Sequence, residues 1–197
     1  LYANAVSSDP NALSIVVDWT PTVDTWYHIA LTRQHYDHYL FIDGVVVGND
    51  STTNPITDYS DSFVLGRDGG SDTNYLNGWI DELRVITGYA KWIDNFTPPT
   101  AATTNPVYDY DYTKSLLHFE GVDTSTAILD STLKRSWTAY GNAQIDSSQK
   151  KFLTSSLLLD GSGDYIKTNA SSDFDFGSDD FTIDFWLRRD GDVNDYG

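Results

Sequence analysis

The sequence contains no cysteine, so it has no disulfide, no thiolate nucleophile and no cysteine-ligated zinc site. Glutamate is scarce, because Glu82 and Glu120 are the only two in the chain. No apolar run reaches the length of about 20 residues that a membrane-spanning helix needs, and no signal-peptide pattern opens the sequence. Helical periodicity is nearly absent. These absences predict a β-protein without membrane insertion.

Basic residues are also few, since 12 Lys and Arg face 29 Asp and Glu and the formal net charge is −17. Such a charge repels phosphate backbones, so we expect no nucleic-acid partner. It attracts divalent cations, and clusters of Asp with Asn, Gly and backbone carbonyls suit calcium. The alternative is that the acidic residues keep a β-protein soluble and protect its sheet edges.

What the chain does have is a folding composition: 197 residues, of which 40% are hydrophobic and 14% aromatic. This length suits one large β domain or two small ones. Turn-forming residues separate runs rich in β-branched and aromatic residues, which is the all-β pattern. One helical turn is expected at 89–92, before the prolines at 98 and 99. The predicted strands are 13–17, 26–33, a hairpin over 39–47, 63–66, 79–85, 116–119, 156–159, 164–167 and 181–187.

Two of these runs have a period of two that assigns their side chains to opposite faces. In 181–187 the alternating apolar residues are expected to face the core, and the residues between them to face outward. The expected core residues are Phe181, Ile183, Phe185 and Leu187, and the expected outward residues are Asp180, Thr182, Asp184, Trp186 and Arg188. In 79–85 the same period places Asp81 on an apolar face with Leu83 and Val85.

Three motifs carry a family resemblance: TWYHIA at 25–30, GWIDELRV at 78–85 and FTIDFW at 181–186, with LLLDGSGDY at 157–165 before the third. Together they resemble the laminin-G-like, concanavalin A-type lectin family. The resemblance implies an all-β, antiparallel jelly-roll sandwich used mainly to recognise sugars, peptides or surfaces. Domains of this type occur, often in tandem, in viral tail fibres, bacterial adhesins and extracellular enzymes. Fold membership does not fix the ligand.

The motifs stand in an unusual order. Residues 1–98 resemble the C-terminal half of such a sandwich, residues 115–197 resemble the N-terminal half, and the polar, proline-containing stretch 99–114 is expected to be a linker. Two explanations are open: a permuted sandwich, or a segment that spans two tandem repeats. The halves are expected to pair with each other within the chain or with a neighbouring chain.

Some relatives with this fold are glycoside hydrolases, which need two carboxyl groups roughly 5–5.5 or 6.5–9.5 Å apart. The compact Glu-x-Asp-x-Glu-like run of that branch is missing here, and the two glutamates lie in different motifs. No Gly-x-Ser-x-Gly elbow precedes a helix, and the glycine-rich run 67–72 lacks the lysine and helix of a phosphate loop. We therefore expect the protein not to be an enzyme.

The resemblance makes calcium the candidate cofactor, because relatives often bind it near the sandwich rim. The matching candidate ligands are Asp81, Asp130 and Ser131. One departure weakens the match: relatives commonly have Ser-Gly after the Asp-Ser pair, whereas this chain has Thr132 and Leu133 there. The alternative for Asp81 is that its carboxylate accepts hydrogen bonds from loop amides. His35 and His38, which bracket a turn, form a weak metal pattern.

Sugar binding would use aromatic platforms with polar groups nearby. The first candidate is Trp186, which alternates with Asp184 and Arg188 on the expected outward face. The other candidates are Tyr36, Tyr39 and Trp92. The alternative is that these rings cover the sheet or pack on the linker.

The sequence thus favours a non-catalytic recognition or structural module of a larger extracellular or virion protein, of tail-fibre or adhesin type, that binds a glycan or a protein surface. A first alternative is an architectural subunit that assembles head to tail with copies of itself or with neighbouring repeats, each half-domain completing that of a neighbour. A second is an accessory domain of a glycan-acting enzyme.

Overall fold

A computed structural model describes residues 2–4, 13–56, 62–67, 74–103 and 111–191 of the chain. Within these residues it contains strands β1 to β14 and one short 3-10 turn, η1 (Ser172–Phe174). No helix in the described ranges is long and apolar enough to cross a membrane. The strands pair antiparallel throughout, so the expected all-β sandwich is confirmed.

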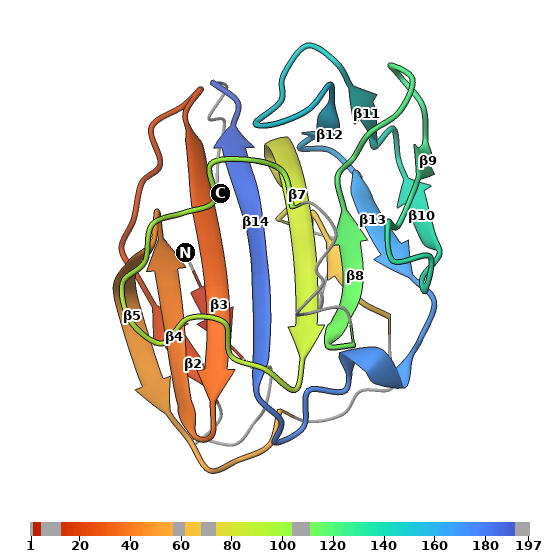
Figure 1. Ribbon diagram of the computed structural model, residues 1–197. Coiled ribbons are helices and arrows are strands. Elements are labelled where there is room, and N and C mark those ends of the chain that lie inside the picture. The colour runs from red at the N-terminus through yellow and green to blue at the C-terminus, as the bar shows by residue number, and fades with distance from the viewer. Residues whose placement is uncertain (1, 5–12, 57–61, 68–73, 104–110, 192–197) are drawn as a thin grey trace.

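The larger sheet has eight strands and forms the broad layer at the front of Figure 1. Its order is β11, β12, β7, β14, β3, β4, β5, and β8 also pairs with β7. The strands are β3 (Trp26–Gln34), β4 (Asp37–Ile42), β5 (Val45–Ser51), β7 (Asn77–Thr87), β8 (Thr113–Leu117), β11 (Gln144–Asp146), β12 (Ser156–Asp160) and β14 (Phe181–Arg189).

A four-stranded sheet in the order β6, β13, β10, β9 packs on one face of the larger sheet. Its strands are β6 (Val64–Leu65), β9 (Ala127–Ile128), β10 (Trp137–Tyr140) and β13 (Tyr165–Thr168). Beside it, β1 (Tyr2–Asn4) and β2 (Ser14–Val16) form a two-stranded sheet. We call the face of the eight-stranded sheet toward these two small sheets its inner face.

Two apolar clusters fill the space behind the inner face. The larger lies between β7, β8 and β12 and the four-stranded sheet, and it includes Leu83, Phe119, Trp137, Leu157 and Ile166. The smaller lies behind β3 and β4 and is closed by Leu13 and Ile15 next to and within β2. Phe185 and Leu187 of β14 pack against both clusters. The inner-face residues predicted for 181–187 therefore lie where the sequence placed them.

The two segments that resemble half-domains pair with each other within one chain. β14 from the second segment lies between β3 and β7 from the first, and β8, β12 and β13 also pair with strands of the first segment. β8 begins at Thr113, within the last two residues of the predicted linker 99–114, whose residues 104–110 lie outside the described ranges. The sandwich is thus closed by intrachain ladders.

Each predicted run contains a strand, whereas β1, β9, β10 and β11 were not predicted. The helical turn expected at 89–92 was wrong. Residues 88–103, which we call the strap, contain no helix and run across the front of β3, β4 and β14 as the yellow-green segment of Figure 1. The strap backbone bonds to sheet side chains: Thr32 Oγ1 donates to the Trp92 carbonyl at 2.7 Å, and the Lys91 amide donates to Thr182 Oγ1 at 2.9 Å.

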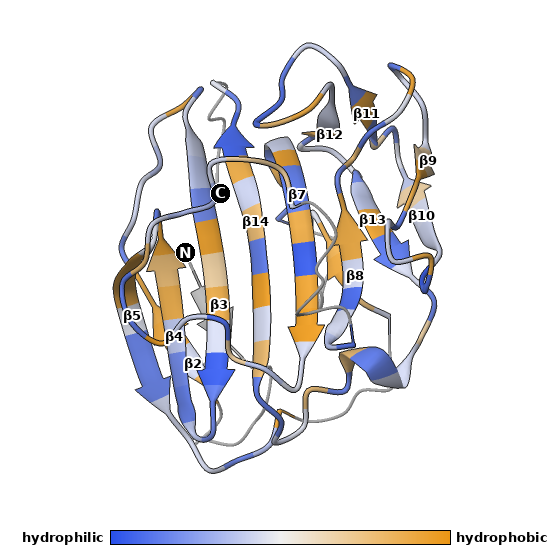
Figure 2. Cartoon of the chain, viewed as in Figure 1, coloured by the Kyte–Doolittle hydropathy of each residue, from blue (hydrophilic) through white to orange (hydrophobic). Residues whose placement is uncertain are grey.

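A β-bulge in β7 corrects the predicted faces of 79–85. Asp81 pairs with Trp186 and Arg84 with Asp184, so one extra residue of β7 lies between these pairs. Glu82 takes a positive φ of 54° there. Ile80 and Leu83 therefore share the inner face, whereas Asp81 and Arg84 lie on the outer face. Hydrophobic and hydrophilic bands follow one another along β7 and β14 in Figure 2.

Candidate functional site

The outer face of the eight-stranded sheet carries most of the residues predicted to bind a ligand, but it is a buried layer. Asp184 is 3% exposed and Trp186 is 6% exposed. Both side chains lie on the outer face, as the alternation predicted, but this face is covered and not open to solvent. The strap and the loop after β11 cover them, and a strand buried on both faces cannot be recognised by alternation alone.

An ion pair lies at the centre of this buried layer. Arg84 Nε donates to Asp184 Oδ1 at 2.9 Å and Arg84 Nη2 donates to Asp184 Oδ2 at 3.0 Å, a bidentate arrangement. His28 Nε2 lies 3.3 Å from the same Oδ2. Burial acts to raise the pKa of Asp184, but Arg84 and His28 outweigh it and hold the pKa below its usual value. Asp184 is therefore a fixed anion that joins β3, β14 and β7.

Aromatic rings enclose this ion pair. Trp92 and Phe96 of the strap stack in parallel with centroids 4.0 Å apart, and both meet His28 edge-on at 5.6 Å. On the other side, Lys151 Nζ lies 3.7 Å from the centroid of the Trp186 ring. Trp92 is thus a packing residue of the strap, as the alternative to ligand binding predicted, and Trp186 is capped by a lysine.

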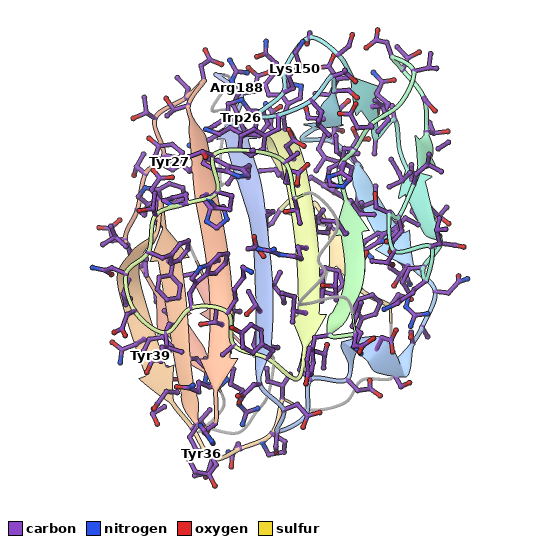
Figure 3. The ribbon with its side chains drawn as sticks, viewed as in Figure 1. Trp26, Tyr27, Tyr36, Tyr39, Lys150 and Arg188 are labelled. Carbon is purple, nitrogen blue, oxygen red and sulfur yellow. The ribbon has the colours of Figure 1, made fainter. Side chains whose placement is uncertain are left out.

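The remaining predicted ligand residues do not come together. Arg188 lies at one end of the sheet, where it pairs with Asp24 at 2.8 Å, and Tyr36 lies at the opposite end in the β3–β4 turn (Figure 3). The eight residue steps of β3 between these ends span roughly 26 Å. Tyr36 is 55% exposed and Tyr39 is half-buried against Phe41. The six residues therefore do not form one sugar site.

Asp81 is almost completely buried, at 1% exposure. Its Oδ2 accepts the backbone amides of Lys151 and Phe152 at 2.8 and 3.0 Å, as the alternative to calcium predicted. Its Oδ1 is buried without a hydrogen-bond partner. Burial raises the pKa of Asp81 to about 7, and the two amide bonds only partly offset it. Asp81 fixes the loop after β11 onto the sheet.

Beside Asp81, the bulged residue Glu82 holds a second polar group. Glu82 Oε1 lies 2.6 Å from His118 Nδ1, and Glu82 Oε2 accepts the Thr103 amide of the strap at 2.9 Å. The hydrogen bond to Glu82 raises the pKa of His118. The other glutamate, Glu120, accepts the amides of Thr154 and Ser155 at 3.0 and 3.2 Å. Both glutamates therefore bind segments that cover the sheet.

Asp130 is buried, and its oxygens are filled by protein donors. Oδ1 accepts from the Thr132 amide and hydroxyl and from the Leu116 amide, and Oδ2 accepts from the Ser115 hydroxyl. The amide of Ser131 donates to the Leu116 carbonyl. Leu116 pairs with Arg84, three residues along β7 from Asp81, so these contacts do not join Asp81 and Asp130 in one coordination shell. Calcium binding stays a prediction.

Metal-ligating side chains do not gather elsewhere in the described part of the chain. No group of three or more His, Asp and Glu side chains there is arranged to hold a metal ion. His38, one member of the predicted weak pattern, is fully buried, whereas His35 is exposed.

Comparison with known families agrees with this architecture. Residues 2–92 match a laminin-G-type family model described as the concanavalin A-like lectin/glucanases superfamily. The match runs from β1 through β7 into the strap, and it does not test the order of the two half-domain motifs. No curated protein and no solved structure matches the chain.

The sandwich also has a solvent-facing sheet surface that the sequence did not single out. On the outer side of the four-stranded sheet, Tyr140 of β10 pairs with Tyr165 of β13, and their rings stack with centroids 4.5 Å apart and an interplanar angle of 3°. Tyr140 is 40% exposed. β10 is a four-residue strand without a clear alternation, so only the aromatic residue before Gly-Asn at its end could have drawn attention.

Proposed function

We propose that this protein is a non-catalytic recognition module that binds a glycan or a protein surface, as part of a larger extracellular or virion protein of tail-fibre or adhesin type. The superfamily match supports a binding module, because this fold presents rigid sheet surfaces and loops to ligands. The tail-fibre or adhesin setting comes from the family resemblance.

The observation that carries the non-catalytic part is the commitment of the outer-face carboxylates to structural partners. Hydrolysis of a glycosidic bond needs a pair of carboxyl groups that reach the substrate, one acting as acid and the other as base or nucleophile. Asp184 is held by Arg84 and His28, Asp81 by two loop amides, and Glu82 by His118 and Thr103. Each of the three is at most 5% exposed.

Head-to-tail assembly remains the alternative for the whole chain. It requires half-sandwiches that seek complements in neighbouring chains, whereas the ladders of β14 with β3 and β7 are made within one chain. A monomeric recognition module uses these ladders without further assembly. The accessory-domain alternative differs from the proposal only in the protein to which the module is attached.

A glycan array followed by a product assay tests the proposal. We expect the protein to bind at least one glycan on the array and to release no new reducing ends from that glycan on prolonged incubation. New reducing ends that disappear in the Glu82→Gln variant would contradict the non-catalytic part. An array without any bound glycan would contradict the glycan form and leave a protein surface as the partner.

A further inference from the structure

Arg67, Tyr165 and Tyr140 form one stack, and Tyr140 is its last member. Arg67 places its guanidinium carbon 4.3 Å from the Tyr165 centroid, and Tyr140 stacks on Tyr165 at 4.5 Å, so the two neighbours lie on opposite faces of the Tyr165 ring. On the other side of β10, β9 pairs only with Trp137 and Thr138. No described strand therefore pairs with β10 beside Tyr140 there, and Tyr140 is 40% exposed, so we infer that its ring face away from Tyr165, which we call the outer ring face, is accessible.

A buried carboxylate, that of Asp164, holds the turn that follows Tyr140. Asp164 is fully buried, its Oδ1 accepts the Asn142 amide at 2.7 Å, and its Oδ2 accepts the Asp160 amide at 3.0 Å. Between Tyr140 and Asn142, Gly141 adopts a φ of 67°, and a Cβ there would lie 2.3 Å from Asp164 Oδ1. The glycine and the carboxylate thus fix the turn after Tyr140 relative to the loop before Tyr165.

The turn after Tyr140 also presents hydrogen-bonding groups to solvent. The Asn142 side-chain amide donates to Asp160 Oδ2 at 2.9 Å, and both residues are exposed. Asp160 Oδ1 accepts the Ser162 amide. A carboxamide has a second N–H and a carbonyl oxygen, and each carboxylate oxygen has a second lone pair. The pair can therefore donate to one hydroxyl group and accept from another without breaking its internal bond.

We propose that Tyr140, Asn142 and Asp160 form a binding site for one hexopyranose unit of a neutral glycan. The C–H face of the sugar stacks on the outer ring face of Tyr140, and two ring hydroxyls bind Asn142 and Asp160. The net charge of −17 opposes acidic glycans, which makes a neutral sugar the favoured class. This assignment rests on the proposed recognition function: it names the place on the molecule where the glycan binds.

Affinity electrophoresis through gels that contain soluble β-glucan, galactan or mannan tests the site. We expect the wild-type protein to be retarded by at least one of these polymers, with Tyr140→Ala binding about tenfold more weakly, which corresponds to about 1.4 kcal/mol for the loss of an aromatic anchor. Tyr140→Phe keeps the ring and is expected to bind as wild type. Tyr112→Ala removes a tyrosine of comparable exposure in the segment before β8 and serves as the matched control.

The outcomes separate the site from the function. Retardation of the wild type that survives in Tyr140→Ala, with its circular dichroism unchanged, would overturn the site and leave glycan recognition standing. Equal weakening by Tyr112→Ala would also overturn it. Retardation by none of the neutral polymers, or only by an acidic polysaccharide, would overturn the neutral-sugar assignment, and the glycan array decides whether glycan recognition itself fails.

Discussion

At the scale of single residues, the outer face is organised by charges that the sheet has buried. Asp184 compensates Arg84 in a bidentate pair, and His28 lies beside them under aromatic rings. Removing one partner of a buried pair leaves an uncompensated charge, which costs far more than losing an exposed pair. The network therefore stabilises the junction of β3, β14 and β7 and leaves little freedom for chemistry.

We expect Asp184→Asn to lower the free energy of unfolding by about 3–5 kcal/mol, because Arg84 would remain buried without its anion. For a chain of this length that corresponds to a Tm lower by roughly 10 °C, measured by thermal and urea unfolding. Asp24→Asn is the control: it breaks an ion pair whose Asp side chain is 59% exposed and should cost less than about 1 kcal/mol. If both variants lost the same free energy of unfolding, the stabilising role of the buried Asp184–Arg84 pair would be contradicted.

Asp81 predicts a pH dependence with a definite sign. Its pKa is about 7 in the folded protein and 3.8 in an unfolded reference, so between these values the folded state holds a proton that the unfolded state has released. Stability contributed by protonated Asp81 is therefore present below pH 4 and lost as the pH rises toward 7.

Asp81→Asn keeps an oxygen that can accept the Lys151 and Phe152 amides but cannot ionise. We expect the variant to become more stable relative to wild type by about 4 kcal/mol between pH 4 and pH 8, at 1.36 kcal/mol per pKa unit. Urea unfolding at each pH measures the difference. A constant difference across this range would show that Asp81 titrates normally.

At the scale of elements, the sequence predicted which runs become strands better than it predicted their faces. Alternation correctly placed Phe185 and Leu187 on the core side of β14. It placed Trp186 on the outer face but could not show that this face is covered, because Lys151 and Phe152 of the loop after β11 pack on the ring. It failed for Asp81 because the positive φ of Glu82 inserts a bulge, which leaves no mark in the pattern.

The same limits explain the candidate site. The alternative predicted for Asp81, bonding to loop amides, could be stated from one residue, because a buried carboxylate needs donors. The identity of the loop at 151–152 depends on a pairing distant in the sequence. The Tyr140–Tyr165 stack likewise depends on the register of β10 against β13.

The strap predicts an effect confined to one element. Thr182 Oγ1 accepts the Lys91 amide and donates to the Tyr89 carbonyl, so Thr182→Val removes two anchors without changing the side-chain volume much. We expect trypsin to cleave after Lys91 about thirtyfold faster, because the two lost bonds together cost roughly 2 kcal/mol. Thr138→Val, on the exposed side of β10, should leave cleavage unchanged. An unaltered rate in Thr182→Val would mean that other contacts hold the strap.

At the scale of the whole molecule, the central feature is closure of one sandwich by strands from the two ends of the described chain. β14 supplies this closure by pairing with β3 over Trp26–Arg33 and with β7 on its other side. Intrachain closure places the strap-covered face and the tyrosine-bearing face on one body. The recognition proposal requires this closure within one chain, whereas an architectural subunit would exchange half-domains between chains.

The molar mass in solution across a dilution series tests this closure most directly. Light scattering should give 22.0 kDa at every concentration, since each chain completes its own sandwich. Dimers or longer assemblies that dissociate on dilution would contradict intrachain closure and make assembly through half-domain exchange the function.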